Sequence, residues 1–173
     1  MQPLELNSQR STNLGKRLKL ALCEADIRVP SPNESEPHFT RAVLAPVVRA
    51  VLGQLDGINL KFRGDGGDTQ AVPASALDID FYPDLAVSIG KQHLWAAEVK
   101  VLRATGRQNA IATALGQATL YRSRYEHVLV VLIDVAPVSR TSQLQLLENA
   151  QQMGLEVVLR TRVGKSLTRQ VGH

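Results

Sequence analysis

The sequence contains a single cysteine, Cys23, and no long apolar run. One cysteine excludes an internal disulfide framework, a cysteine-rich zinc site and a four-cysteine iron–sulfur cluster. No apolar run approaches the roughly 18 residues of a membrane span, and residues 1–10, MQPLELNSQR, lack the apolar core of a signal peptide. We therefore expect a cytoplasmic protein without a membrane partner, stabilised by burial alone.

The chain is long enough for one compact domain over residues 1–173, and 44% of its residues are hydrophobic. Its 20 lysines and arginines exceed its 16 aspartates and glutamates, which gives a net charge of +4. Such a small excess permits an anionic partner without requiring one. Bulk composition therefore leaves the function open.

Two helices are expected ahead of the first strand. Apolar residues at helical spacing predict both of them, and three prolines mark the exposed connector between them. Pro46 should kink the second helix because it lacks a backbone donor, and Gly57 should end it. We expect residues 1–12 to be flexible and residues 14–27 to form the first helix. The connector covers residues 29–37, and the second helix runs from about residue 35 to residue 57.

The remainder of the chain alternates between strand and helix patterns. The glycine-rich segment 64–68 is expected to be a loop. Together these elements predict an α/β sandwich with an αβββαβ core over about 35–134 and a mixed central sheet flanked by helices. An extra N-terminal helix precedes this core, and a C-terminal helix and strand follow it, with the strand paired in parallel. Strands are expected at 58–63, near Leu77, twice within 81–101, at 127–135 and at 155–161, and helices at 105–125 and 141–153.

The stretch PDLAVSIGKQHLWAAEVK, residues 83–100, carries the most chemical information. Side chains alternate across a strand, so Glu98 and Lys100 point to one face while their neighbours form an apolar face. If the turn is the three residues 90–92, Ile89 faces His93, Val87 faces Trp95 and Asp84 faces Glu98. A two-residue turn would shift the register by one and bring apolar residues onto the face of Glu98.

Direct opposition would place the Cβ atoms of the two acidic residues roughly 4.5 to 5.5 Å apart. Like charges at that distance either raise one pKa or hold a cation. Mg²⁺ suits a site with one or two carboxylates and water as ligands. The alternative is that Glu98 and Lys100 form a solvated strand face and Asp84 is a turn residue.

Pro83-Asp84, Glu98-Val99-Lys100 and the αβββαβ order resemble the PD-(D/E)XK nuclease superfamily, which has the restriction-endonuclease-like fold. Gln117 and Tyr121 on the following helix resemble the QxxxY motif of its RecB-like members. The resemblance covers roughly residues 35–134. It implies a Mg²⁺-dependent endodeoxyribonuclease that hydrolyses phosphodiester bonds in DNA.

The resemblance also implies roles for individual residues. Asp84, Glu98 and the main-chain carbonyl of Val99 would hold Mg²⁺, or Mn²⁺ in its place, and Lys100 would orient water or stabilise developing charge. Residues four apart share a helical face, so the glutamine and tyrosine of the QxxxY motif could touch a phosphate or the metal-bound water. A surface amide and an ordinary packing tyrosine are the alternatives for that pair.

The superfamily often adds an acidic residue from its first helix. Glu36, or Glu34 in its place, stands at the start of the expected second helix, where an acid also suits the helix dipole. Cys23 stands alone, which excludes the relatives that carry an iron–sulfur cluster on several cysteines.

Four arginines follow the motif without an intervening acid between Lys100 and Tyr125, and they are expected to contact DNA phosphates. A chain of this size has no room for a separate recognition domain, and cutting both strands needs two sites, so we expect a homodimer or larger complex. The alternative function is a non-catalytic nucleic-acid-binding or assembly module with the same fold. The expected DNA contacts are Arg103, Arg107, Arg122 and Arg124.

Overall fold

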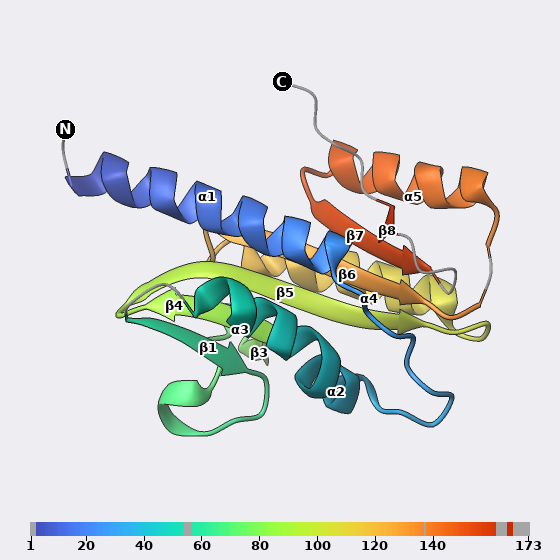
Figure 1. Cartoon of the computed structure of the whole chain (residues 1–173), viewed down its shortest axis with the longest axis horizontal. Coiled ribbons are helices and arrows are strands. Elements are labelled where there is room, and N and C mark those ends of the chain that lie inside the picture. Colours follow the sequence, from blue (N-terminus) through green and yellow to red (C-terminus); the bar gives the residue numbers. More distant parts are fainter. Residues whose placement is uncertain (1–2, 54–56, 137, 162–165, 168–173) are drawn as a thin grey trace.

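A computed structural model describes residues 3–53, 57–136, 138–161 and 166–167 of the chain. It shows an α/β sandwich in which helices flank both faces of a six-stranded mixed sheet (Figure 1). At this level the predicted fold class is confirmed. No helix within the described ranges is long and apolar enough to cross a membrane.

Three helices cover one face of the sheet: α1 (Pro3–Glu24), α2 (Glu36–Phe39) and α3 (Ala45–Leu52) (Figure 1). Helix α1 begins at Pro3 rather than at residue 14. Residues 4–13 contain no proline or glycine, so they can continue a helix although they show no apolar periodicity. Periodicity therefore locates only the part of α1 that faces the core.

The second predicted helix is divided into two parts. A π-helical turn, Thr40–Leu44, separates α2 from α3, and Pro46 lies within the first two positions of α3. Proline has no backbone N–H to donate to the preceding turn, which accounts for an interruption in this part of the chain. The helix ends at Leu52, so the predicted end at Gly57 is wrong by one turn or more.

The strands of the main sheet follow the order β1-β4-β5-β6-β7-β8. Pairing is antiparallel from β1 to β5, parallel from β5 to β7, and antiparallel between β7 and β8. The parallel strands around the last helix are confirmed. The bounds are β1 Ile58–Phe62, β4 Leu85–Ile89, β5 Gln92–Leu102, β6 His127–Asp134, β7 Glu156–Thr161 and β8 Ser166–Leu167.

Helices α4 (Arg107–Tyr121) and α5 (Arg140–Gln152) cover the opposite face. Two apolar cores result, one on each side of the sheet. Val99 of β5 belongs to the core under α1 to α3, whereas Ala96, on the other face of the same strand, belongs to the core under α4 and α5. The strand is thus buried on both faces, as a central strand in an α/β sandwich should be.

The hairpin between β4 and β5 differs from the prediction in its turn. Ile89 pairs with Gln92, so the turn has two residues, and the expected pairing of Ile89 with His93 is wrong. A β-bulge at Leu94 adds one unpaired residue to β5 and restores the expected pairing of Val87 with Trp95. Alternation alone could not reveal the bulge, because Leu94 and Trp95 are both buried and both lie in the same core.

A second, two-stranded sheet consists of β2 (Ala74–Ala76) and β3 (Ile79–Phe81). The strand expected near Leu77 is present as two short strands rather than one, and Leu77 and Asp78 form the turn between them, with φ values of 51° and 60°. Two-residue hairpin turns require positive φ and usually contain glycine or asparagine. A leucine in this position gives no turn signal, although its side chain is 94% exposed.

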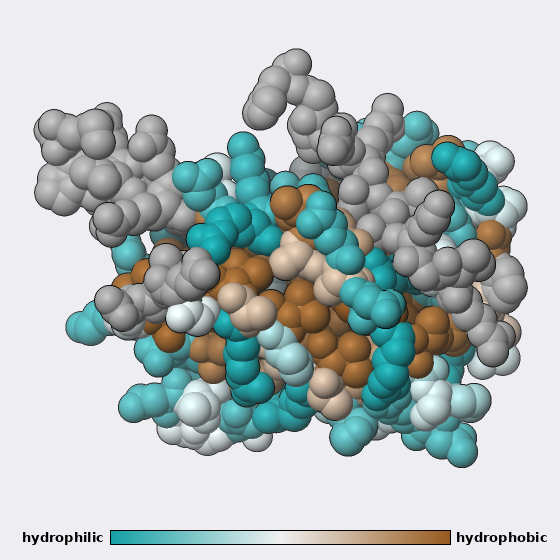
Figure 2. Space-filling view, viewed as in Figure 1, coloured by the Kyte–Doolittle hydropathy of each residue, from teal (hydrophilic) through white to brown (hydrophobic). Residues whose placement is uncertain are grey.

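Apolar surface is visible on the face that α1 and α3 cover. Figure 2 shows it as a band that runs between these helices and is bordered by hydrophilic residues. Partly buried residues of α3 and of the π-helical turn pack against the core below, among them Val43, Val47 and Val51. The helices thus cover the sheet without sealing it completely.

We predict that Arg160→Met lowers the free energy of unfolding by about 3 kcal/mol. Arg160 is buried in β7 and donates hydrogen bonds to the carbonyls of Cys23, at 2.6 Å, and Ala25, at 2.8 Å, where α1 ends. The substitution leaves both carbonyls without this charged donor. Urea denaturation measures the loss, with Arg140→Met, an exposed arginine at the start of α5, as the matched control. An equal change in both variants would contradict the prediction.

Candidate active site

Strand β5 continues beyond the point where its neighbour β4 begins. Leu85, the first residue of β4, pairs with Ala97, so the backbone N–H groups of Val99 and Val101 on that edge have no strand partner. Carboxylates take the place of the missing strand. The Val99 N–H donates to Asp84 Oδ2 at 2.8 Å, and the Val101 N–H donates to Glu36 Oε2 at 2.9 Å.

The strand register places three charged residues in a row across the sheet. Continuing the pairing of Leu85 with Ala97 by one residue puts Asp84 opposite Glu98, as the sequence predicts. The pairing of β1 with β4 likewise puts Arg63 opposite Asp84, and the Arg63 N–H donates to the Asp84 carbonyl at 3.5 Å. Opposed residues share a face of the sheet, so this row concentrates charge at one place.

Lys100 connects the two glutamates of the site. Its Nζ lies 2.8 Å from Glu98 Oε1 and 2.8 Å from Glu36 Oε1. The hydroxyl of Tyr121 lies 2.9 Å from Glu98 Oε2 and also 2.9 Å from the carbonyl of Tyr82. Apart from the ion pair with Lys100, Glu98 Oε1 has no hydrogen-bond partner among the described residues.

Burial and mutual repulsion set the protonation of the acidic pair. Glu98 is completely buried, and burial followed by the charge of Asp84 raises its pKa to about 7. Burial also raises the pKa of Asp84, against the opposing effect of the Val99 N–H. Burial lowers the pKa of Lys100, but the charge of Glu98 and the contact with Glu36 outweigh it, so the net shift is upward. The lysine is therefore an ammonium at neutral pH, while Glu98 is poised to gain or lose a proton.

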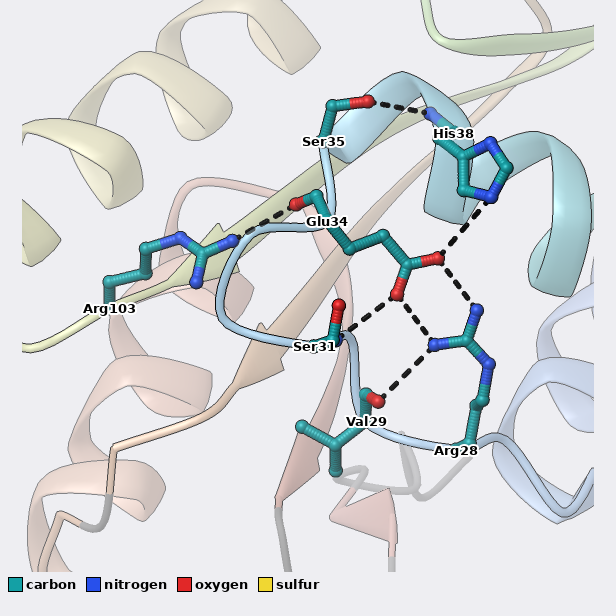
Figure 3. Close-up of polar contacts among 7 residues, drawn as sticks. All are labelled: Arg28, Val29, Ser31, Glu34, Ser35, His38 and Arg103. Atoms are coloured by element: carbon teal, nitrogen blue, oxygen red, sulfur yellow. Dashed lines mark hydrogen bonds and ion pairs between the residues drawn. The ribbon is translucent and has the colours of Figure 1, made fainter.

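Glu36, not Glu34, joins this group. Figure 3 shows the Glu34 side chain turned toward Arg28, whose Nη1 and Nη2 each lie 2.6 Å from one of its oxygens. Its oxygens also contact the Ser31 N–H at 3.1 Å and His38 Nε2 at 3.8 Å, so Glu34 braces the connector before α2. Ser35 caps α2 by accepting from the His38 N–H, which leaves the Glu36 carboxylate available to β5.

The remaining motif residues and the four arginines are distributed along α4 and its ends. Gln117 lies one turn before Tyr121, and its Oε1 is buried without a hydrogen-bond partner among the described residues. Two arginines hold the C-terminal end of β5 and β6: Arg103 donates to the Glu34 carbonyl, and Arg107 to Asp134 and the Ala136 carbonyl. The other two, Arg122 and Arg124, are exposed just after the end of α4. The four guanidinium groups therefore do not form one cluster.

A cavity of about 250 Å³ adjoins Asp84 at the end of β1. It contains two arginines that the sequence analysis missed, Arg41 and Arg63. Alternation places Arg63 on the polar face of β1, but residues 63–84 separate the two strands, so no turn rule fixes their register. The lining residues are Pro37, Thr40, Arg41, Arg63, Gly64 and Asp84.

The donor set is compatible with a hard divalent cation. Among the described residues, no three His, Cys, Asp or Glu side chains group together as a metal site on their own. Magnesium, however, is commonly bound through one or two carboxylates with water as the remaining ligands. Asp84 and Glu98 supply that pair, and the Val99 carbonyl points to the same strand edge as its N–H. A cation there would stabilise the charged forms of two carboxylates whose pKa values burial raises.

Comparison with known proteins adds no identification: no family model, curated protein or solved structure matches the chain.

We predict that Glu98→Gln removes a pH-dependent loss of stability. The pKa of Glu98 rises from an ordinary value of 4.5 to about 7 on folding, so the folded state favours its protonated form. Stability from this group is fully present below pH 4.5 and is lost as the pH rises through about 7. The variant should therefore gain stability relative to the wild type over that window, by up to about 3 kcal/mol. Chemical denaturation at several pH values tests this; a constant difference between the two proteins would contradict it.

Proposed function

We propose that this chain is a metal-dependent endodeoxyribonuclease of the PD-(D/E)XK type. The observation that carries the proposal is the meeting of Asp84, Glu98 and Lys100 at the unpaired edge of β5. Glu98 and Lys100 come from β5, and Asp84 directly precedes its antiparallel neighbour β4. The residues of the sequence motif therefore lie close together in the fold. Strand β5 alone could have carried Glu98 and Lys100 without bringing Asp84 into contact with it.

The order of the elements supports the finer assignment of the fold. Helices α2 and α3, then β1, β4 and β5, then α4 and β6, follow the αβββαβ order, with β5 and β6 parallel. The small β2–β3 sheet is an insertion between β1 and β4. We propose that this arrangement is restriction-endonuclease-like, with α1 and the α5–β7 unit as additions.

In this proposal Asp84, Glu98 and the Val99 carbonyl would hold Mg²⁺, which would supply Lewis-acid polarisation of the scissile phosphate and activation of water. Lys100 presents an ammonium beside Glu98, where it orients the attacking water or stabilises the charge that develops on the phosphate oxygens. Glu36 positions Lys100 from α2. Tyr121 donates to the second oxygen of Glu98, which supports a role for the tyrosine of the QxxxY pair.

The proposed reaction is hydrolysis, so water is the only co-reactant that it needs. The water oxygen forms a new bond to phosphorus, the bond to the leaving sugar oxygen breaks, and the proton lost by the water is matched by one gained by the leaving group. A carboxylate that holds a divalent cation stays ionised, so in this proposal the proton passes to solvent water rather than to Glu98.

One observation favours the alternative, a non-catalytic nucleic-acid-binding or assembly module. Lys100 contacts both glutamates and so neutralises much of their charge without any cation. Structural ion-pair networks also perturb pKa values. DNA as the partner, the homodimer and the cytoplasmic location all stay predictions.

We predict that Glu98→Gln and Lys100→Ala each reduce Mg²⁺-dependent DNA cleavage by at least about 100-fold, because each removes a charge from the reacting centre. Cleavage of labelled duplex and single-stranded DNA gives the rates. Glu126→Gln and Lys91→Ala, two exposed positions away from this cluster, are the matched controls and should retain wild-type rates. Metal-dependent binding of DNA with no cleavage by any of the proteins would favour the non-catalytic module.

We also predict that Mg²⁺ or Mn²⁺ stabilises the folded protein. At a metal concentration 100 times the dissociation constant, the gain is about 2.7 kcal/mol, or roughly 5 to 10 °C in melting temperature. The gain should increase as the pH rises through about 7, because the metal competes with the proton on Glu98. Asp84→Asn should remove most of it, whereas Asp78→Asn, in the β2–β3 turn, should not. Equal shifts in these two variants would contradict a metal site at Asp84.

A further inference from the structure

The cavity beside Asp84 combines features that suit an anion. Two of its lining residues are arginines, and a third, Thr40, carries a hydroxyl. Arginine presents planar, permanently charged donors that match the oxygens of a phosphate group. The acidic pair lies at the margin of this cavity, since Asp84 belongs both to its wall and to the candidate metal site.

Thr40 provides an observation independent of the arginines. The residue is 2% exposed, and its Oγ1 is buried with no hydrogen-bond partner among the described residues. A helical threonine hydroxyl ordinarily bonds to a carbonyl of the preceding turn. That turn is α2, whose Glu36 and Pro37 carbonyls accept from the Thr40 backbone N–H, but the Thr40 hydroxyl bonds to neither. A buried hydroxyl without a partner costs stability and calls for a specific explanation. A ligand that accepts a hydrogen bond in the cavity supplies one.

The two arginines are prepared differently. Arg41 is held in place: its guanidinium pairs with Asp65, donates to the Arg63 carbonyl at 3.3 Å and lies 4.6 Å from the centre of the Phe62 ring. The exposed Arg63 side chain forms no hydrogen bond or ion pair with the described residues, although its charge opposes the rise in the pKa of Asp84. Its register places it opposite Asp84. The Arg63 guanidinium is thus available to donate hydrogen bonds to a ligand beside Asp84, whereas Arg41 is held in the wall of the cavity by its own contacts.

We propose that this cavity binds one phosphate group of a DNA strand, with hydrogen bonds donated by Thr40 Oγ1 and the Arg63 guanidinium. The bound phosphate would fix the strand so that an adjacent phosphodiester reaches Asp84 and Glu98. Arg63 and Thr40 are therefore positioning residues rather than catalytic ones. The positioning role rests on the proposed function, whereas phosphate binding by the cavity does not.

The first experiment uses inorganic phosphate with the metal-free protein at low ionic strength. Phosphate should bind the wild type and shift the amide NMR signals of Thr40 and Gly64. Thr40→Val and Arg63→Gln should each weaken binding by at least about five-fold. Thr119→Val and Arg140→Gln are the matched controls: Thr119 is exposed on α4, and Arg140 lies on α5 over the far side of the sheet.

The stability of Thr40→Val gives a second readout. Valine has nearly the shape of threonine, so removing an unpartnered hydroxyl should leave the melting temperature of the free protein unchanged or raise it. Weaker phosphate binding by a variant of equal or greater stability cannot come from misfolding. Unchanged binding by this variant would show that the hydroxyl is not a ligand and would overturn the proposal.

The second experiment identifies the source of the phosphate with short duplex and single-stranded DNA in the Glu98→Gln background, so that no cleavage intervenes. Each DNA carries either a 5′-phosphate or a 5′-hydroxyl. A preference for the phosphorylated end that Arg63→Gln abolishes assigns the cavity to a terminal phosphate, and equal binding of both assigns it to an internal one. In either case Arg63→Gln should reduce the slope of log K against log salt by about 1.

The two proposals fail in different ways. If phosphate and DNA bind as described but no protein cleaves DNA with Mg²⁺, only the proposed function is wrong. If the wild type cleaves DNA and Arg63→Gln and Thr40→Val keep its KM and its phosphate affinity, only the cavity proposal is wrong. A loss in Arg140→Gln equal to that in Arg63→Gln would also overturn it, because general charge attraction would then explain the binding.

Discussion

The site depends on a mismatch in length between two neighbouring strands. Because β4 begins only at Leu85, the edge of β5 beyond Ala97 presents backbone donors that must find partners within the protein. Asp84 and Glu36 satisfy these donors with carboxylate oxygens. The backbone donors at the edge of β5 need acceptors, and the carboxylates that serve as acceptors are thereby held together at one place. Hydrogen bonding to main-chain atoms holds them there more firmly than contacts between flexible side chains would.

The negative charges of the acidic residues are only partly offset by neighbouring groups. Glu98, buried under α4, receives an ammonium from its own strand and a hydroxyl from Tyr121. Burial and the second carboxylate nevertheless keep its pKa near 7. The group is thus stable without a bound ion, yet it holds more negative charge than one lysine can offset. A divalent ion and a polyanion bound together would complete that balance, which is why the neighbouring arginines matter.

Much of this arrangement could be predicted from the sequence, and the exceptions have physical causes. Alternation along β4 and β5 predicts the opposition of Asp84 and Glu98 because a shift of one residue would bring apolar side chains onto the face of Glu98. Alternation cannot choose between Glu34 and Glu36, since both lie near the start of the same helix and only the contact of Glu34 with Arg28 separates them. The register of β1 against β4 depends on contacts across a long insertion. Arg63 therefore entered the site only through the folded structure.

The bulge at Leu94 separates the length of the hairpin turn from the alignment of the acidic pair. A two-residue turn with one bulged residue and a three-residue turn without a bulge give the same pairing from Val87 onward. One residue could therefore be deleted at Gly90 and Lys91, and the bulge lost with it, while Val87 stayed paired with Trp95 and Asp84 stayed opposite Glu98. The tip of this hairpin can thus change in length by one residue without a change in the alignment of the acidic pair.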